Sequence, residues 1–163
     1  MAGLDFDPIA EAARQWGERW PAVDEMHTVT SIMRAQQILI ARLDALLKPY
    51  ALTFSRYEVL VLLTFSREGQ LPMGKIGERL QVHATSVSSL IQRLQASGLV
   101  TRVQHPDDGR TYLAGITDKG REVVERATAD LTAVRFGIGE LDKDQLAEIS
   151  ADLGILRQAA GDF

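Results

Sequence analysis

Residues 73–121 decide the fold and read MGKIGERLQVHATSVSSLIQRLQASGLVTRVQHPDDGRTYLAGITDKGR. The pattern predicts a helix over 73–80, a turn at 81–83 and a second helix over 84–94. Gly77 lies where the two helices would cross, and its missing side chain lets their backbones approach closely. The apolar positions have the spacing of two steeply crossed helices: Ile76, Leu80, Val82, Val87 and Leu90.

The second predicted helix has a face of short polar side chains opposite its apolar face. Hydroxyl and amide groups can bond base edges or phosphate oxygens in a major groove, and they are too small to hold the helix away from DNA. The alternative is the solvated face of an ordinary amphipathic helix. The residues of this polar face are Thr85, Ser86, Ser88, Ser89, Gln92 and Arg93.

A strand hairpin is predicted directly after this helix. Ser97-Gly98 ends the helix, and Pro106-Asp107-Asp108-Gly109 has the composition of a turn between two strands, 99–105 and 110–116. The alternation of Tyr112, Ala114 and Ile116 predicts one face on the core. A hairpin in this position is typical of the wing of a winged helix, here residues 99–117.

The wing has side chains suited to nucleic acid. Arg110, near the tip, can enter a narrow minor groove, where the negative potential is strongest. Asp108 can hold Arg110 by a charge-assisted hydrogen bond. Arg102 and His105 are further candidates on the wing. We therefore expect phosphate contacts from Lys75, Arg93 and Arg102, base contacts from the polar helix face, and a minor-groove contact from Arg110.

Helices are predicted on both sides of this region. They cover 26–48, 53–65, about 117–137 and about 141–158, and a shorter one at 7–21 contains Trp16 and Trp20. Thr53 and Thr117-Asp118 are expected to cap the helices that they begin. These two rings either hold the partner subunit or a ligand, or fasten the N-terminal arm to the dimer surface. The flanking helices have more apolar surface than a small lobe can cover, so a second copy is expected to bury it.

The predicted fold is mainly α with a small antiparallel β-hairpin wing, that is, a winged helix-turn-helix. The expected organisation is an N-terminal arm and dimerisation helix at 1–48, the winged helix-turn-helix lobe at 49–121, and C-terminal dimerisation helices at 122–163.

Composition limits the class of protein. The 163 residues are 45% hydrophobic, have a net charge of −4 and include no cysteine, which excludes disulfides and thiolate metal sites. Residues 67–121 have a net charge of +3 and the remainder −7, which favours a basic lobe facing phosphate. The sequence has no signal peptide and no run long enough for a bilayer, so we expect a cytoplasmic protein with no membrane contact.

Enzymatic functions have little support in the sequence. Residues 69–76 match most of a phosphate-binding loop, but Ile76 stands where a Ser or Thr must bind magnesium. His27, His83 and His105 are too far apart to suggest a metal site. We expect no catalytic residues, no metal and no cofactor, and we interpret His83 as a turn residue near phosphate.

The run Asp108-Gly109-Arg110 to Thr117-Asp118-Lys119-Gly120 resembles the MarR family of bacterial transcription regulators. Leu52-Thr53, Gly77-Glu78-Arg79-Leu80 and Gly98-Leu99-Val100 follow in the family's order, and the resemblance covers roughly residues 28–158. It implies a homodimer that binds a pseudo-palindromic site on double-stranded DNA, often as a repressor released by a small molecule.

The resemblance also bears on the effector. Ser89 stands where many members have a basic residue, and Leu90 stands where the urate-responsive branch has an arginine, so urate is not the expected effector. The family's ligand site lies between the dimer helices and the head, which makes Trp20, Met33 and Tyr57 the candidates here. The alternative function is a winged-helix module that binds protein and not DNA.

Overall fold

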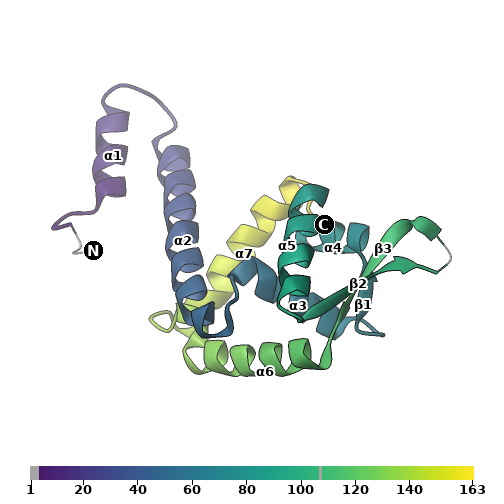
Figure 1. Ribbon diagram of the computed structural model, residues 1–163. Coiled ribbons are helices and arrows are strands. Elements are labelled where there is room, and N and C mark those ends of the chain that lie inside the picture. The colour runs from purple at the N-terminus through teal and green to yellow at the C-terminus, as the bar shows by residue number, and fades with distance from the viewer. Residues whose placement is uncertain (1–3, 107) are drawn as a thin grey trace. The chain divides into compact units, whose positions relative to one another are not determined.

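The computed structural model describes residues 4–106 and 108–163, apart from the side chain of Asp108. The chain divides into two compact units, residues 1–45 and residues 46–163, and each is described by itself. Most residues are helical, and the strands form a single small antiparallel sheet (Figure 1). The predicted fold class, mainly α with a hairpin wing, is confirmed. The predicted boundaries at residues 48 and 121 stay predictions.

The first unit holds α1 (Pro8–Gly17) and most of α2 (Val23–Leu47), joined by a short loop (Figure 1). Asp7 caps α1, because its carboxylate accepts the backbone N–H of Ile9 at 2.9 Å. The Nε1–H of Trp16 donates to the carbonyl of Pro21 at 2.8 Å, and its ring centroid lies 4.9 Å from that of Trp20. The two tryptophans therefore fix the chain where it leaves α1.

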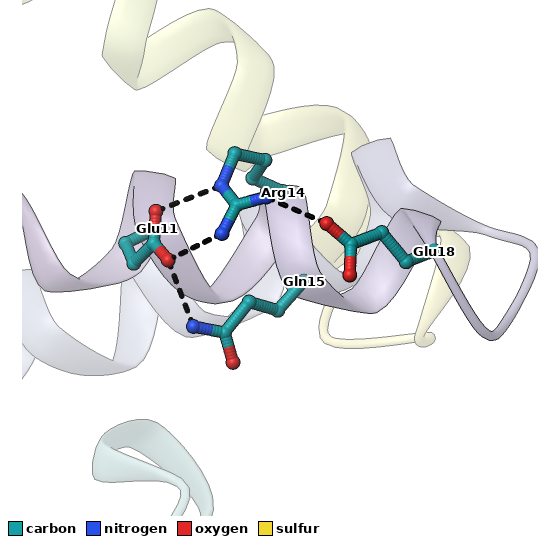
Figure 2. A network of polar contacts seen from close by, with 4 residues as sticks. All are labelled: Glu11, Arg14, Gln15 and Glu18. Carbon is teal, nitrogen blue, oxygen red and sulfur yellow. Dashed lines mark hydrogen bonds and ion pairs between the residues drawn. The ribbon is translucent and has the colours of Figure 1, made fainter.

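Helix α1 has a network of polar and charged side chains, Glu11, Arg14, Gln15 and Glu18 (Figure 2). The Arg14 guanidinium donates to both oxygens of Glu11, at 3.0 and 2.8 Å, and to Glu18 at 2.6 Å. Gln15 also donates to Glu11. The hydrogen bond from Arg14, with that from Gln15, lowers the pKa of Glu11 from 4.5 to about 2.

The second unit contains the remaining helices around one apolar core. The short 3-10 helix η1 (Lys48–Tyr50) leads to α3 (Phe54–Phe65), and the later helices are α6 (Asp118–Ala133), η2 (Arg135–Gly137) and α7 (Lys143–Ala159). The Thr117 hydroxyl accepts the N–H of Gly120 at 3.0 Å, which confirms the predicted cap of α6. The largest fully buried side chains of this core are Leu47, Val59, Leu60, Leu63, Ile76, Val87, Ile91, Leu94 and Leu131.

The sheet has three strands in the order β1-β3-β2. β2 (Val100–His105) and β3 (Asp108–Ile116) form the predicted hairpin, with Arg102 opposite Ala114 and Val103 opposite Leu113. The edge strand β1 (Gln70–Pro72) pairs with the far end of β3 and was not predicted. Ala114 is fully buried, whereas Tyr112 is 41% exposed. The predicted core face is therefore right at Ala114 and wrong at Tyr112, where the hairpin extends beyond the core.

The last helix leaves apolar side chains in solvent. Asp142 caps α7 by accepting the N–H of Asp144 and of Gln145, both at 2.9 Å. No residue of α7 is buried within the described chain. Ile149, Leu153 and Leu156 recur at helical spacing and are 45%, 37% and 57% exposed. Such a stripe is typical of a helix that packs on another protein surface.

None of the helices in the described ranges is long and apolar enough to cross a membrane.

Candidate nucleic-acid interface

The helix-turn-helix is formed by α4 (Met73–Leu80) and α5 (Ala84–Ala96). Gln81 ends α4 in the left-handed conformation, with φ 52°, and the N–H of Val82 donates to the carbonyl of Gly77 at 3.1 Å. A Cβ at Gly77 would lie 3.1 Å from the carbonyl oxygen of Val82 and 3.4 Å from a methyl group of Val87. The predicted close approach at Gly77 is confirmed.

His83 begins α5 and acts as its N-cap. Its Nδ1 accepts the backbone N–H of Thr85 at 3.3 Å and lies 2.8 Å from the Thr85 hydroxyl. Sequence reasoning placed His83 in the turn but missed this capping role, because histidine is not among the usual N-cap residues. The bond to the backbone leaves the opposite ring nitrogen, Nε2, directed away from the helix end.

The outer face of α5 is polar and open to solvent, as expected. Val87, Ile91 and Leu94 are buried and fix the opposite face of the helix on the core. A helix anchored in this way presents its outer side chains on a rigid support. The predicted contact residues on α5 are all exposed: Thr85, Ser86, Ser88, Ser89, Gln92 and Arg93.

The wing places a second group of polar side chains beside the helix-turn-helix lobe. The Arg102 guanidinium carbon lies 4.0 Å from the centre of the Tyr112 ring, within the range of a cation–π interaction. Arg110 is exposed and His105 is half-buried. Near the tip, the Gln104 amide donates to the carbonyl of Gly109 across a register shift. The predicted role of the Asp108 side chain lies outside the part of the chain that the structure describes.

Lys75, predicted to contact phosphate, is on α4 and forms an ion pair with Glu78 at 2.7 Å. Both side chains are more than half exposed, so water screens the pair and its contribution to stability is small. The negative charge of Glu78 offsets part of the attraction that Lys75 would offer to a phosphate.

Sequence reasoning missed Arg56, which comes from α3 and lies next to α5. Arg56 and Arg93 line one hollow together with Thr53, Ser86 and Ser89. Thr53 has the N-cap position of α3, as predicted, but its side chain forms no capping bond and instead accepts from Arg56 Nε at 3.2 Å. The signal in the sequence is the i, i+3 spacing of Thr53 and Arg56. This spacing alone does not show that Arg56 lies beside α5, which depends on how α3 and α5 pack.

The three ligand candidates lie in different units. Trp20 and Met33 belong to the first unit and are 53% and 56% exposed. Tyr57 belongs to the second unit and is buried, with its hydroxyl 2.9 Å from that of Thr128 on α6. It lines a cavity of about 560 Å³ between α3 and α6. The other lining residues are mostly apolar: Phe54, Val61, Thr64, Phe65, Val124, Glu125 and Phe136.

Two further facts describe the chemistry of the chain. Among the described residues, no group of three or more His, Cys, Asp or Glu is arranged to hold a metal ion. Burial raises the pKa of Glu58 on α3.

A two-helix head, followed by a strand hairpin that completes a three-stranded sheet, defines a winged helix-turn-helix protein. Residues 52–111 match the family model described as MarR family. The chain resembles Sco5413, a MarR family transcriptional regulator from Streptomyces coelicolor, with 60% identity and a TM-score of 0.82 over 87% of this chain and 99% of that one. The chain therefore belongs to the MarR family of transcriptional regulators.

Two more relatives agree with this assignment. Sco3205, a MarR family regulator from Streptomyces coelicolor solved in complex with DNA, is 28% identical with a TM-score of 0.77, over 86% of this chain and 90% of that one. YhbI, an uncharacterised HTH-type transcriptional regulator from Bacillus subtilis, is 27% identical over 72% of this chain and 76% of the relative. This membership makes the chain a DNA-binding transcription regulator and not an enzyme.

Proposed function

We propose that the protein binds a pseudo-palindromic operator as a homodimer and regulates transcription, as a repressor. The observation that carries this proposal is the exposed hydroxyl and amide face of α5 beside an exposed wing with Arg102 and Arg110. In this arrangement α5 enters the major groove, and Arg110 enters the adjacent minor groove. As a regulator of chromosomal DNA, it acts in the cytoplasm.

The proposed homodimer is supported by the apolar side chains that the single chain leaves in solvent. On α7 these are Ile149, Leu153 and Leu156, and on α2 they include Val29 and Met33, each 56% exposed. A second copy supplies the same surface in return, as twofold symmetry requires. Two heads related in this way bind half-sites about 34 Å apart, which is one turn of DNA.

We further propose that a small, mainly apolar molecule regulates DNA binding from the cavity between α3 and α6. The lining is aromatic and aliphatic, and its polar groups include Glu125 and the Thr128 hydroxyl. Because α3 also supports the head, an occupant that changes the spacing of α3 and α6 would favour one placement of α5 over another. Urate, a polar anion, does not match this lining. The assignment of Trp20 and Met33 to a ligand stays a prediction from the sequence.

The test is a titration of the purified protein against a duplex from the region upstream of its own gene, at two salt concentrations. Phosphate contacts release counterions, so the affinity should fall steeply with added salt. Binding that does not depend on salt, or no binding to any duplex recovered by selection from a random pool, would contradict the proposal. The second outcome would favour a protein-interaction module, for which the relatives give no support.

A further inference from the structure

The hollow between α3 and α5 has a chemistry of its own. It measures about 510 Å³, and it opens between the first turn of α3 and the outer side of α5. Two arginines, Arg56 and Arg93, line it from opposite sides. The remaining polar side chains of the lining are hydroxyl groups. Thr53 and Ser55 supply them from the start of α3, and Thr85, Ser86 and Ser89 supply them from α5.

The positive charge of this hollow is not neutralised. None of its lining residues is acidic. Within the described ranges, neither Arg56 nor Arg93 forms an ion pair. The bond from Arg56 Nε to Thr53 fixes the guanidinium, while its terminal nitrogens form no hydrogen bond or ion pair within the described ranges. Arg56 is half-buried, so its charge is less screened than that of a fully exposed side chain.

The hollow also divides the polar face of α5 into two stripes. Ser86, Ser89 and Arg93 follow one another at i, i+3 and i+7, which places them on one side of the helix, and all three line the hollow. Ser88 and Gln92 are spaced i, i+4 and share the neighbouring side. Neither of them lines the hollow, although both are exposed.

The two stripes suit different parts of a duplex. Guanidinium groups flanked by hydroxyl donors match the geometry and charge of a phosphodiester. A glutamine amide with a neighbouring serine suits the donor and acceptor pattern of base edges, because the amide can form two bonds to one adenine. The phosphates form the edges of the major groove. A helix lying in the groove therefore has phosphates along its flanks, and Arg56 lies beside one flank of α5.

We propose that this hollow binds a phosphate of the DNA backbone through Arg56 and Arg93, and that Ser88 and Gln92 are the residues of α5 that read bases. Ser86 and Ser89 then contact phosphate, and Thr53 is a positioning residue that holds Arg56. This inference rests on the proposed function, since it requires that the chain bind DNA. It assigns a phosphate contact to α3, outside the helix-turn-helix and the wing.

The experiment uses a duplex that the wild-type protein selects from a random pool, and an unrelated duplex of the same length. Affinities for both are measured at several salt concentrations for wild type, Arg56→Gln and the double variant Ser88→Ala with Gln92→Ala. For Arg56→Gln we expect the affinity to fall about tenfold on both duplexes, and the salt slope to fall by about 1.8, or about 0.9 for each protomer of the dimer. The double variant should lose affinity only for the selected duplex, with its salt slope unchanged.

Matched variants separate these effects from a general loss of charge or fold. Arg126→Gln removes one positive charge from α6, outside the hollow, and should keep the wild-type slope. Arg56→Lys keeps the charge and should keep most of the slope. Arg93 is exposed, so Arg93→Gln repeats the test if Arg56→Gln melts at a lower temperature than wild type.

Three results would overturn the proposal. In the first, Arg56→Gln and Arg93→Gln keep the wild-type salt slope while the wild type binds DNA. In the second, Arg56→Gln weakens only the selected duplex, which would make it a base reader. In the third, inorganic phosphate at constant ionic strength raises the melting temperature of wild type but not of Arg56→Gln, while the two proteins bind DNA with equal affinity. That result would assign the hollow to a free anion. If the wild type selects no duplex at all, the proposed function fails instead.

Discussion

Arginines in two regions of the chain have opposite surroundings. On α1, Arg14 donates to the carboxylates of Glu11 and Glu18, so its charge is balanced within its own helix (Figure 2). In the second unit, Arg56 and Arg93 have no carboxylate partner in the described ranges and share a hollow lined by hydroxyl groups. We call an arginine balanced when it forms an ion pair with a carboxylate of the same chain, and unbalanced when it does not. A balanced arginine stabilises its own helix, whereas an unbalanced one is available to an anion from outside.

Arg102 on the wing shows a third arrangement. It lies over the ring of Tyr112, which is 41% exposed, and has no ion pair in the described part of the chain. The ring orients the guanidinium and leaves its charge intact. Charge balance, and not the number of arginines, therefore distinguishes the proposed DNA surface from the N-terminal helix. The predictions below test this difference.

The largest expected effect is a loss of stability in the second unit, which holds Arg56, Arg93 and Arg102. A Cβ at Gly120 would lie 2.2 Å from the carbonyl oxygen of Leu99 and 2.8 Å from a side-chain carbon of Ile116. Gly120→Ala should therefore lower the free energy of unfolding by about 3 kcal/mol, measured by urea denaturation. Gly154→Ala is the control, since its added carbon would meet no atom within 4 Å apart from its chain neighbours and the backbone of its own helix. Equal stability of the two variants would contradict the packing described at Gly120.

Among variants that keep the fold, removal of Arg110 from the wing should lower the affinity for DNA the most. Arg110→Ala would delete the proposed minor-groove contact of each protomer, and such a contact is worth about 1–3 kcal/mol. The affinity for a selected duplex should fall at least about 30-fold, measured by fluorescence anisotropy at fixed salt. Arg14→Ala is the matched control on α1 and should bind like wild type. An unchanged affinity for Arg110→Ala would remove the wing from the mechanism.

A smaller effect is expected where an arginine is oriented by an aromatic ring. Tyr112→Leu removes the ring below Arg102, and an exposed cation–π contact is worth about 0.5 kcal/mol per protomer at its lower limit. The affinity of the dimer should fall about fivefold, whereas Tyr112→Phe should keep it. A loss of the same size in both variants would mean that the hydroxyl group, and not the ring, is what matters.

The smallest effect concerns the balanced arginine of α1. The pKa of Glu11 is lowered to about 2 from 4.5, so its ion pair stabilises the folded chain above pH 4.5 and loses this effect as the pH falls towards 2. Glu11→Gln should lower the melting temperature slightly at neutral pH, and the difference should vanish near pH 2. Its DNA affinity should equal that of wild type. A measurable loss of DNA binding would contradict the separation of the two regions.

Local features of the head were predictable from the sequence because each depends on neighbouring residues. The close approach at Gly77 and the cap at Thr117 follow from short-range chemistry, and the structure has both. The hairpin followed from its turn residues. The polar face of α5 was also predictable, since helical period alone separates it from Val87 and Ile91.

The features that were missed depend on contacts between distant segments. Strand β1 is three residues long and contains Pro72, so it has no strand signal of its own, and it forms only because β3 offers an edge. Tyr112 was assigned to the core because alternation does not reveal where a hairpin leaves the lobe. Arg56 acquires its role only from the packing of α3 beside α5. These are properties of the fold, which no single segment encodes.

The most direct test compares the salt dependence of DNA binding for Arg102→Gln and Arg14→Gln, measured side by side on one selected duplex. Both variants lose one positive charge per protomer. If unbalanced arginines neutralise phosphate, the slope of Arg102→Gln should fall by about 1.8 for the dimer, and that of Arg14→Gln should match wild type. Equal slopes for the two variants would contradict the account.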